Sequence, residues 1–321
     1  MSTLQTSITT PARAWRSIAV SPLGATLAAD VDAGDLRTMS DATFSELEAA
    51  WLEYKVIRVR GQSFENADLV AFVRRFGEFQ PNTVAATPDP RMRLPSEEAP
   101  RIAIARDPEA PQVSFISNLV ENDKALGMLG DGELVWHTDQ SSFEVTPSAT
   151  ILYAVEAPSG QGFTEFLDMV AVHDTLPEAL RRRVDTLQLK HDDTYDSAGH
   201  RRPGYSVVTD VRTSPGAIHP LVYTHPVTGR NALFLGRRPH AYVIGLSVPE
   251  SEALLDALWA HTVQERFVWR QDWLPGDVLV WDNRSVMHHR KPFDPKARRL
   301  MRRVCIKGSR PAFVPGGATR R

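Results

Sequence analysis

The sequence predicts a mainly β fold, a β-sandwich or jelly roll with helices packed on its outside. After residue 100 the chain consists largely of short apolar runs separated by turns rich in Pro and Gly, and only a few segments have helical periodicity. The 321 residues are 42% apolar, which is enough for a substantial core. We expect one domain over residues 17–308, a flexible segment at 1–16 and a loose tail at 309–321.

The first part of the chain predicts the order strand, helix, strand, helix. Ser40 and Asp41 are residue types that cap helices, and they precede four apolar residues on one helical face: Phe44, Leu47, Trp51 and Tyr54. Residues 55–60 are rich in Val and predict a strand. A second amphipathic helix should end at Gly77; its apolar face is formed by Leu69, Phe72, Val73 and Phe76.

The later part predicts short strands, two helices and two long loops. The helices are expected at 171–184 and 249–263, and a hairpin should join 221–224 to 232–235. The strands are expected at 113–116, 150–155, 164–167, 278–281 and 300–306. The loops, about 80–100 and 190–213, are polar and longer than ordinary connections, so we predict that they are lids.

Charge and composition exclude several classes of protein. The chain has 37 basic and 39 acidic side chains, whereas nucleic-acid binders and polybasic membrane proteins need a positive surplus. No apolar run approaches the ~20 residues that cross a bilayer, and the N-terminus lacks a signal-peptide pattern. Cys305 is the only cysteine, so no internal disulfide can form, and we expect it to be a small core residue. We therefore expect a cytoplasmic protein that binds neither nucleic acid nor membrane.

Three residues far apart in the sequence suggest a metal site. On an extended chain, residues i and i+2 point the same way, so His137 and Asp139 can present an imidazole and a carboxylate to one ion. A distant histidine, His288 or His289, completes two imidazoles and one carboxylate, the ligand set of non-haem Fe(II) oxygenases. Neighbouring residues on a strand face opposite ways, so only one of the two should bind, and spacing alone does not choose between them.

A cluster of arginines follows the second histidine motif. On a strand, Arg299, Met301 and Arg303 would share one face, and Arg298 and Arg302 the other. We expect the second pair to be solvated. An inward arginine near a metal would be costly to bury unless an anion paired with it, and the planar guanidinium suits a carboxylate. A dicarboxylate ligand would supply that anion.

These residues lie within a wider resemblance that covers roughly residues 17 to 307. The sequence resembles the taurine/2,4-dichlorophenoxyacetate-type 2-oxoglutarate dioxygenases, including the members that degrade aryloxyalkanoate herbicides. The matching motifs are VSPLGA at 20–25, RFGE at 75–78, WHTD at 136–139, EALL at 252–255 and WDNR at 281–284. The resemblance implies a double-stranded β-helix, a distorted jelly roll with flanking helices, and allows a homo-oligomer.

The resemblance also assigns roles to residues. It selects His288 over His289 as the third ligand, so that His137, Asp139 and His288 would hold Fe(II). Arg299, assisted by Thr164, would bind the far carboxylate of 2-oxoglutarate, and O2 would be the other co-substrate. Arg303 would bind an anionic group of the substrate. The implied reaction is hydroxylation of a small organic anion, or its desaturation or C–O or C–N cleavage, with release of succinate and CO2.

Departures from the family pattern concern the substrate. Taurine-type members have a histidine and a tyrosine where this chain has Asn82 and Ala85, and an asparagine where it has Glu133. The segment 235–241 is closer to the herbicide-type members. We therefore expect a carboxylate, aromatic or aliphatic, rather than taurine. Asn82, Glu133 and the lid residue Tyr195 are candidate substrate contacts.

Two other functions remain open at the level of sequence. The same ligands around zinc would make a metal-dependent hydrolase, although zinc sites are often built on a His-x-x-x-His helix, which this sequence lacks. A jelly roll can also bind a ligand without catalysis. A halogenase is disfavoured, because Asp139 occupies the coordination position that a halide would need.

Overall fold

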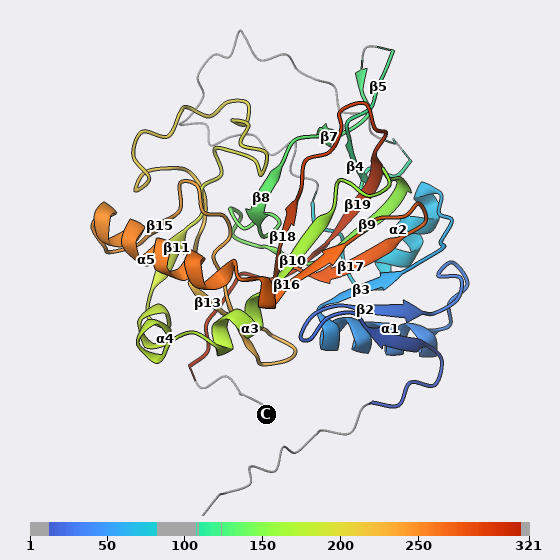
Figure 1. Ribbon diagram of the computed structural model, residues 1–321, viewed down its shortest axis with the longest axis horizontal. Helices are drawn as coiled ribbons and strands as arrows, with labels where there is room; N and C mark the ends of the chain where they lie inside the picture. Colours follow the sequence, from blue (N-terminus) through green and yellow to red (C-terminus); the bar gives the residue numbers. More distant parts are fainter. Residues whose placement is uncertain (1–12, 82–106, 108, 123, 316–321) are drawn as a thin grey trace, which may run out of the picture.

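The computed structural model describes residues 13–81, 107, 109–122 and 124–315, and its core is formed by two antiparallel-rich sheets that face each other (Figure 1). The larger sheet contains, in spatial order, β1 (Ala19–Pro22), β2 (Ala29–Asp32), β3 (Val56–Val59), β17 (Val278–Asp282), β9 (Pro147–Glu156), β19 (Leu300–Lys307), β4 (Ser114–Ser117) and β7 (Met128–Leu129). The smaller one contains β16 (Val268–Gln271), β10 (Thr164–Asp168), β18 (Val286–Arg290) and β8 (Leu134–His137).

Alternation along the strands divides the apolar residues into layers. Between the sheets, Phe166 of β10 packs in one cluster with Leu279 and Trp281 of β17 and Met301 of β19. The intervening residues of the same strands point outward, because successive side chains of a strand alternate between its two faces. The mainly β prediction is therefore confirmed, and the arrangement is a distorted jelly roll with flanking helices.

The helices cover the outer faces of both sheets. On the larger sheet lie α1 (Asp41–Tyr54) and α2 (Asn66–Arg74). The predicted cap is confirmed, since the Ser40 hydroxyl accepts a hydrogen bond from the Thr43 amide. Leu47 and Trp51 of α1 pack in one cluster with Ile57 and Val280 of the sheet. The outer face of the smaller sheet is covered by α3 (Met169–Asp174) and α5 (Val248–Thr262).

Smaller elements complete the domain. The predicted hairpin is confirmed as β13 (Val222–Thr224) paired with β14 (Asn231–Leu233). A three-stranded sheet contains β12 (Ile218–Pro220), β11 (Gln188–Lys190) and β15 (Tyr242–Val243). The remaining elements are the pair β5 (Val120–Glu121) and β6 (Lys124–Ala125), helix α4 (Glu178–Val184) and the 3₁₀ turn η3 (Glu265–Phe267).

Two of the sequence predictions were wrong in detail. The single helix expected at 171–184 is two helices, because Pro177 lacks an N–H and its ring blocks a continuous helix, so that α3 ends before it and α4 begins after it. Cys305 is only half-buried and points between the sheets, where its Sγ lies 3.6 Å from Thr150 Oγ1; burial raises the pKa of its thiol to about 11.

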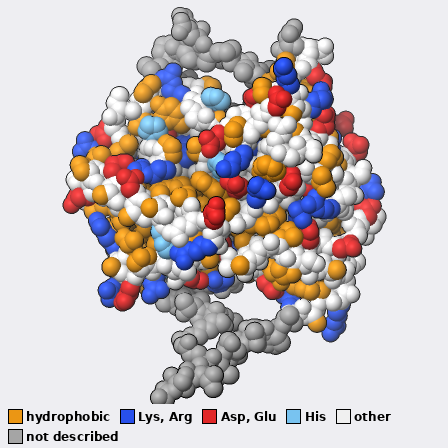
Figure 2. Space-filling view, viewed as in Figure 1, with side chains coloured by type: hydrophobic (Ala, Val, Ile, Leu, Met, Phe, Trp, Pro, Cys, Tyr) orange, Lys and Arg blue, Asp and Glu red, His pale blue; other side chains and the backbone are white. Residues whose placement is uncertain are grey.

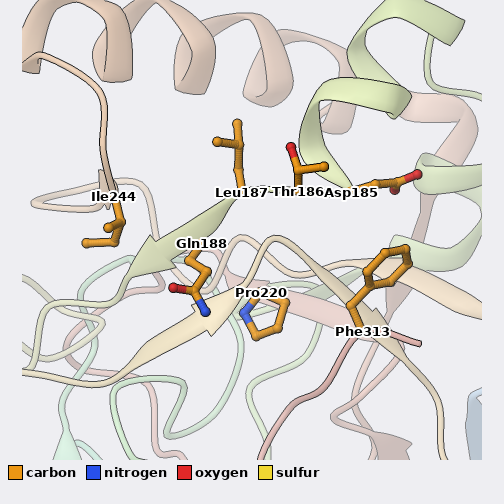
Figure 3. A pocket seen from close by; sticks show the side chains of 7 residues that line it. All are labelled: Asp185, Thr186, Leu187, Gln188, Pro220, Ile244 and Phe313. Carbon is orange, nitrogen blue, oxygen red and sulfur yellow. The ribbon is translucent and has the colours of Figure 1, made fainter. Parts of the chain in front are cut away.

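The C-terminal segment is bound rather than loose as far as residue 315. The Thr224 amide of β13 donates a hydrogen bond to the Ala312 carbonyl, and the Val314 amide donates one to Thr224 Oγ1, both at 2.9 Å. Phe313 lines a cavity of about 290 Å³ together with Pro220 and residues 185–188 (Figure 3). This cavity contains none of the predicted site residues.

The surface agrees with the balanced composition. Acidic and basic side chains are interspersed over the face visible in Figure 2, with no large area of one sign. In the described part of the chain, no helix is both long and apolar enough to cross a membrane. The cytoplasmic location stays a prediction.

Candidate metal centre

His137, Asp139 and His288 meet between the two sheets. His137 ends β8 and lies directly opposite His288 of β18, while Asp139 follows in the turn after β8. One ligand atom of each residue lies within 4.8 Å of the other two, and all three residues are buried. The His137 and His288 ring centroids are 4.1 Å apart, and His137 Nε2 lies 4.0 Å from Asp139 Oδ1. The arrangement can hold a metal ion.

The histidines are held as neutral imidazoles. His137 Nδ1 lies 2.7 Å from the Val135 carbonyl, which places the proton on Nδ1 and the free lone pair on Nε2, the nitrogen nearest Asp139. Burial, then the neighbouring His288, lowers the pKa of His137 to about 3, and burial also lowers the pKa of His288. Neutral imidazole is the form that binds a metal.

Asp139 is held in place by contacts to its backbone and to both of its carboxylate oxygens. The Asn283 side chain accepts a hydrogen bond from the Asp139 amide and donates one to its carbonyl, each at 3.0 Å. Thr150 Oγ1 donates to Oδ2 at 2.8 Å, and Arg303 Nη1 lies 3.2 Å from Oδ1. Burial alone would raise the pKa of Asp139, but Arg303 and the two histidines outweigh it and lower the pKa to about 2. The group is therefore a carboxylate at neutral pH.

The structure separates His288 from His289. His288 faces inward, with its ring centroid 4.9 Å from that of Trp281. His289 faces the other side of β18, where it stacks on Trp136 and where its Nε2 lies 2.6 Å from Glu133 Oε1. Glu133 is thus paired on the far side of the sheet from the three metal-site residues, and we do not include it in the substrate site.

The predicted alternation of arginines is observed at the start of β19. Arg303 points between the sheets, and Arg299 just before the strand is 2% exposed, whereas Arg298 lies at the surface and pairs with Glu156. Arg302 was expected to be solvated, but it is half-buried and donates a hydrogen bond to the Phe64 carbonyl.

Arg299 has no carboxylate partner among the described residues. Its Nε and Nη1 atoms are buried and make no hydrogen bond. Burial, then the positive charge of Arg290, lowers the pKa of its guanidinium to about 9. Buried charges are ordinarily paired, so an unpaired buried guanidinium points to an anionic ligand.

Thr164 and Arg290 lie opposite each other on β10 and β18. Trp273 Nε1 donates a hydrogen bond to Thr164 Oγ1 at 2.9 Å, which leaves the hydroxyl proton free to donate elsewhere. Sequence reasoning missed Arg290, although it is two residues after His288 and so shares its strand face. It also missed the role of Asn283, which the WDNR motif contains.

Of the remaining predicted substrate contacts, Tyr195 lies in the described part of the chain and Asn82 does not. The Tyr195 ring stacks on His240 with centroids 4.7 Å apart, and its carbonyl accepts a hydrogen bond from Arg237. Arg237 in turn makes a β-bridge with His137, so the loop at 190–213 is linked to the metal-site strand. Asn82, and the first predicted lid from residue 82 onward, lie outside the described residues.

The chain is similar to known proteins over most of its length. The family model for "Taurine catabolism dioxygenase TauD, TfdA family" matches residues 19–305. The chain is 33% identical over 301 residues to the (S)-phenoxypropionate/alpha-ketoglutarate-dioxygenase of Sphingobium herbicidovorans, which covers 90% of this chain and 94% of that protein. It is 31% identical over 291 residues to the alpha-ketoglutarate-dependent 2,4-dichlorophenoxyacetate dioxygenase of Cupriavidus pinatubonensis, with 90% and 97% covered.

A solved structure is similar over nearly the same length. The structure of AAD-2 in complex with Mn(II) and N-oxalylglycine has a TM-score of 0.70 and 27% sequence identity. The match covers 93% of this chain and 100% of that one.

Proposed function

The chain belongs to the TauD, TfdA family of dioxygenases, and on that premise we propose that His137, Asp139 and His288 bind its Fe(II). Members of this family use Fe(II), 2-oxoglutarate and O2, and their fold is the double-stranded β-helix. The reaction class expected from the sequence, a 2-oxoglutarate-dependent dioxygenase, is thereby confirmed. The ligand assignment rests on one observation: the three side chains are buried, and one ligand atom of each lies within 4.8 Å of the other two.

The donor set fits the metal. Two neutral imidazoles and one carboxylate are the donor set of non-haem Fe(II) oxygenases, and they would leave coordination positions for a chelating co-substrate and O2. When bound, the iron and 2-oxoglutarate supply the oxidising chemistry, in which an atom of O2 enters the substrate and 2-oxoglutarate becomes succinate and CO2. The chain itself orients the ligands: Asn283 holds the backbone of Asp139, and Thr150 holds its carboxylate.

We assign the far carboxylate of 2-oxoglutarate to Arg299 and Thr164. The buried, unpaired guanidinium of Arg299 supports this role, because a bidentate carboxylate would satisfy its free donors. The Thr164 hydroxyl accepts from Trp273 and keeps its own proton for the ligand.

The substrate is a small organic anion, and we favour a carboxylate. The relatives named for phenoxypropionate and 2,4-dichlorophenoxyacetate support this choice, as does Arg303 beside the metal-site carboxylate. We assign Arg303 to the anionic group of the substrate. We keep Tyr195 as a candidate substrate contact, because its loop is linked to His137 through Arg237. The loop at 190–213 acts as the lid that excludes water.

The metal assignment is tested by anaerobic addition of Fe(II) and 2-oxoglutarate. The wild-type protein should give the weak visible charge-transfer band of the chelate, which zinc cannot give. His288→Ala should abolish the band, and the matched variant His289→Ala should retain it. A band that persists in His288→Ala, or is lost equally in both folded variants, contradicts the assignment.

The substrate class is tested by succinate formation. Phenoxyalkanoates, aliphatic carboxylates, sulfonates and neutral analogues are compared at equal concentration. Carboxylates should stimulate succinate release, and Arg303→Gln should raise the KM for them more than it lowers kcat. Equal stimulation by neutral analogues would rule out the anionic substrate, and a product mass from the best substrate identifies the reaction type.

A further inference from the structure

We propose that Arg290 is a second arginine in the co-substrate site, so that the far carboxylate of 2-oxoglutarate is bound by two guanidinium groups, those of Arg290 and Arg299. This inference rests on the proposed function of the site and adds a residue that determines which 2-oxo acid is accepted.

The position of Arg290 follows from the strand register. In the pairing of β10 with β18, Phe166 lies opposite His288 and Thr164 lies opposite Arg290. Side chains of directly opposed residues on one face have Cβ atoms about 4.5–5.5 Å apart, so the Arg290 stem starts beside Thr164. A carboxylate that contacts the Thr164 hydroxyl is therefore within reach of Arg290.

The spacing along β18 suits a short diacid. His288 and Arg290 are separated by two residues on the same face, which is roughly 7 Å along a strand. A ligand held at the His288 end would reach Arg290 by extending along this face. The same strand thus presents the metal-binding imidazole and, one repeat further on, a positive charge for the far end of the ligand.

Arg290 is buried and incompletely bonded. It is 2% exposed, and its Nη2 donates hydrogen bonds to the carbonyls of Leu129 and Gly132. Its Nε and Nη1 atoms have no partner in the described part of the chain. The negative charge of Asp131 interacts with Arg290 at longer range, but the two side chains form no ion pair within 4.0 Å. The two carbonyls therefore fix one edge of the guanidinium and leave its other donors free.

The two arginines lie beside the same aromatic ring. Their guanidinium carbons lie 5.4 Å (Arg290) and 5.9 Å (Arg299) from the Phe293 ring centroid. Both arginines are buried, each with 2% of its surface exposed. Two buried like charges that make no ion pair among the described residues are unfavourable, and a carboxylate bound between them would relieve both the repulsion and the missing hydrogen bonds.

A purely structural role makes a different prediction. If Arg290 served only to hold the backbone at Leu129 and Gly132, its loss would loosen that loop and affect all ligands of the site alike. A role in binding the far carboxylate predicts a loss confined to ligands that carry this group. The two roles are therefore separated by a pair of 2-oxo acids that differ only at the far end.

The experiment compares 2-oxoglutarate with 2-oxopentanoate, which has the same carbon chain but no far carboxylate. Dissociation constants are measured anaerobically from the Fe(II) chelate band for wild type, Arg290→Gln, Arg299→Gln and the exposed control Arg298→Gln. Arg290→Gln should raise the dissociation constant of 2-oxoglutarate on the order of 10- to 100-fold, as expected for a lost charged hydrogen bond. The dissociation constant of 2-oxopentanoate should stay within about twofold of the wild-type value. Arg298→Gln should change neither.

Arg290→Lys keeps a charge but loses the planar guanidinium. It should therefore lose less affinity than Arg290→Gln, again for 2-oxoglutarate alone. The same variant replaces Arg290→Gln in the test if the glutamine variant does not fold. Unchanged 2-oxoglutarate affinity, or equal losses for both acids, overturns the role of Arg290. A wild-type protein that gives no chelate band with either acid contradicts the proposed function itself, which distinguishes the two failures.

Discussion

Arg299 should destabilise the protein without its ligand, and Arg299→Met tests this directly. The guanidinium is 2% exposed, and burial, then Arg290, lowers its pKa from 12.5 to about 9. At roughly 1.4 kcal/mol per pKa unit, the charged form of Arg299 is disfavoured in the folded protein by on the order of 5 kcal/mol. Because the folded pKa lies below the unfolded one, this penalty is fully present at neutral pH and disappears only as pH rises toward the unfolded pKa.

Methionine fills much of the same space without a charge. Replacing even a paired buried charge by apolar residues of similar volume can stabilise a protein by roughly 1–4 kcal/mol, so for the unpaired Arg299 we expect about 1–3 kcal/mol after imperfect packing. At about 2–4 °C per kcal/mol, the Tm of the ligand-free protein should rise by roughly 2–12 °C. The exposed Arg298→Met is the matched control, and it should change stability by less than about 0.5 kcal/mol.

The same variant should lose its response to the co-substrate. With Mn(II) present, 2-oxoglutarate at one hundred times its Kd should stabilise the wild type by about 2.7 kcal/mol, because it binds only the folded state. Arg299→Met should respond to Mn(II) but not to 2-oxoglutarate. A lower Tm for the ligand-free variant, or stabilisation by 2-oxoglutarate equal to wild type, would refute the reasoning, since either result means that Arg299 is already satisfied within the protein.

Three further variants test the supporting residues. Asn283→Ala should weaken metal binding roughly 10- to 100-fold, because Asn283 holds the backbone of Asp139; isothermal titration with Mn(II) measures it, and unchanged affinity would contradict the role. Thr164→Val should weaken the binding of 2-oxoglutarate about tenfold in the chelate assay, while the affinity for the metal stays the same. Asp282→Asn should cost about 3–5 kcal/mol in urea unfolding, because His225 loses a buried partner at 2.8 Å. Although burial opposes it, the Arg284 guanidinium lowers the pKa of Asp282. The contribution of Asp282 to stability is therefore present above about pH 4 and declines as pH falls, and the variant should lack this decline.

Local patterns in the sequence account for much of the site. His137 and Asp139 lie two residues apart on an extended segment, so their common direction follows from strand geometry. Arg299 and Arg303 were likewise placed together by alternation along one predicted strand. The break in the helix expected at 171–184 is also local information, because Pro177 interrupts the helix where the apolar periodicity continues.

What the sequence determined by itself is which residues share a face: period-2 alternation along a single strand requires no knowledge of its neighbours. Only the tertiary structure decided which faces meet. The pairing of His289 with Glu133, and the placement of Arg290 opposite Thr164, depend on the register between strands that are distant in the sequence. A shift of one residue in that register would turn the arginine to the other side of the sheet, and no local pattern specifies it.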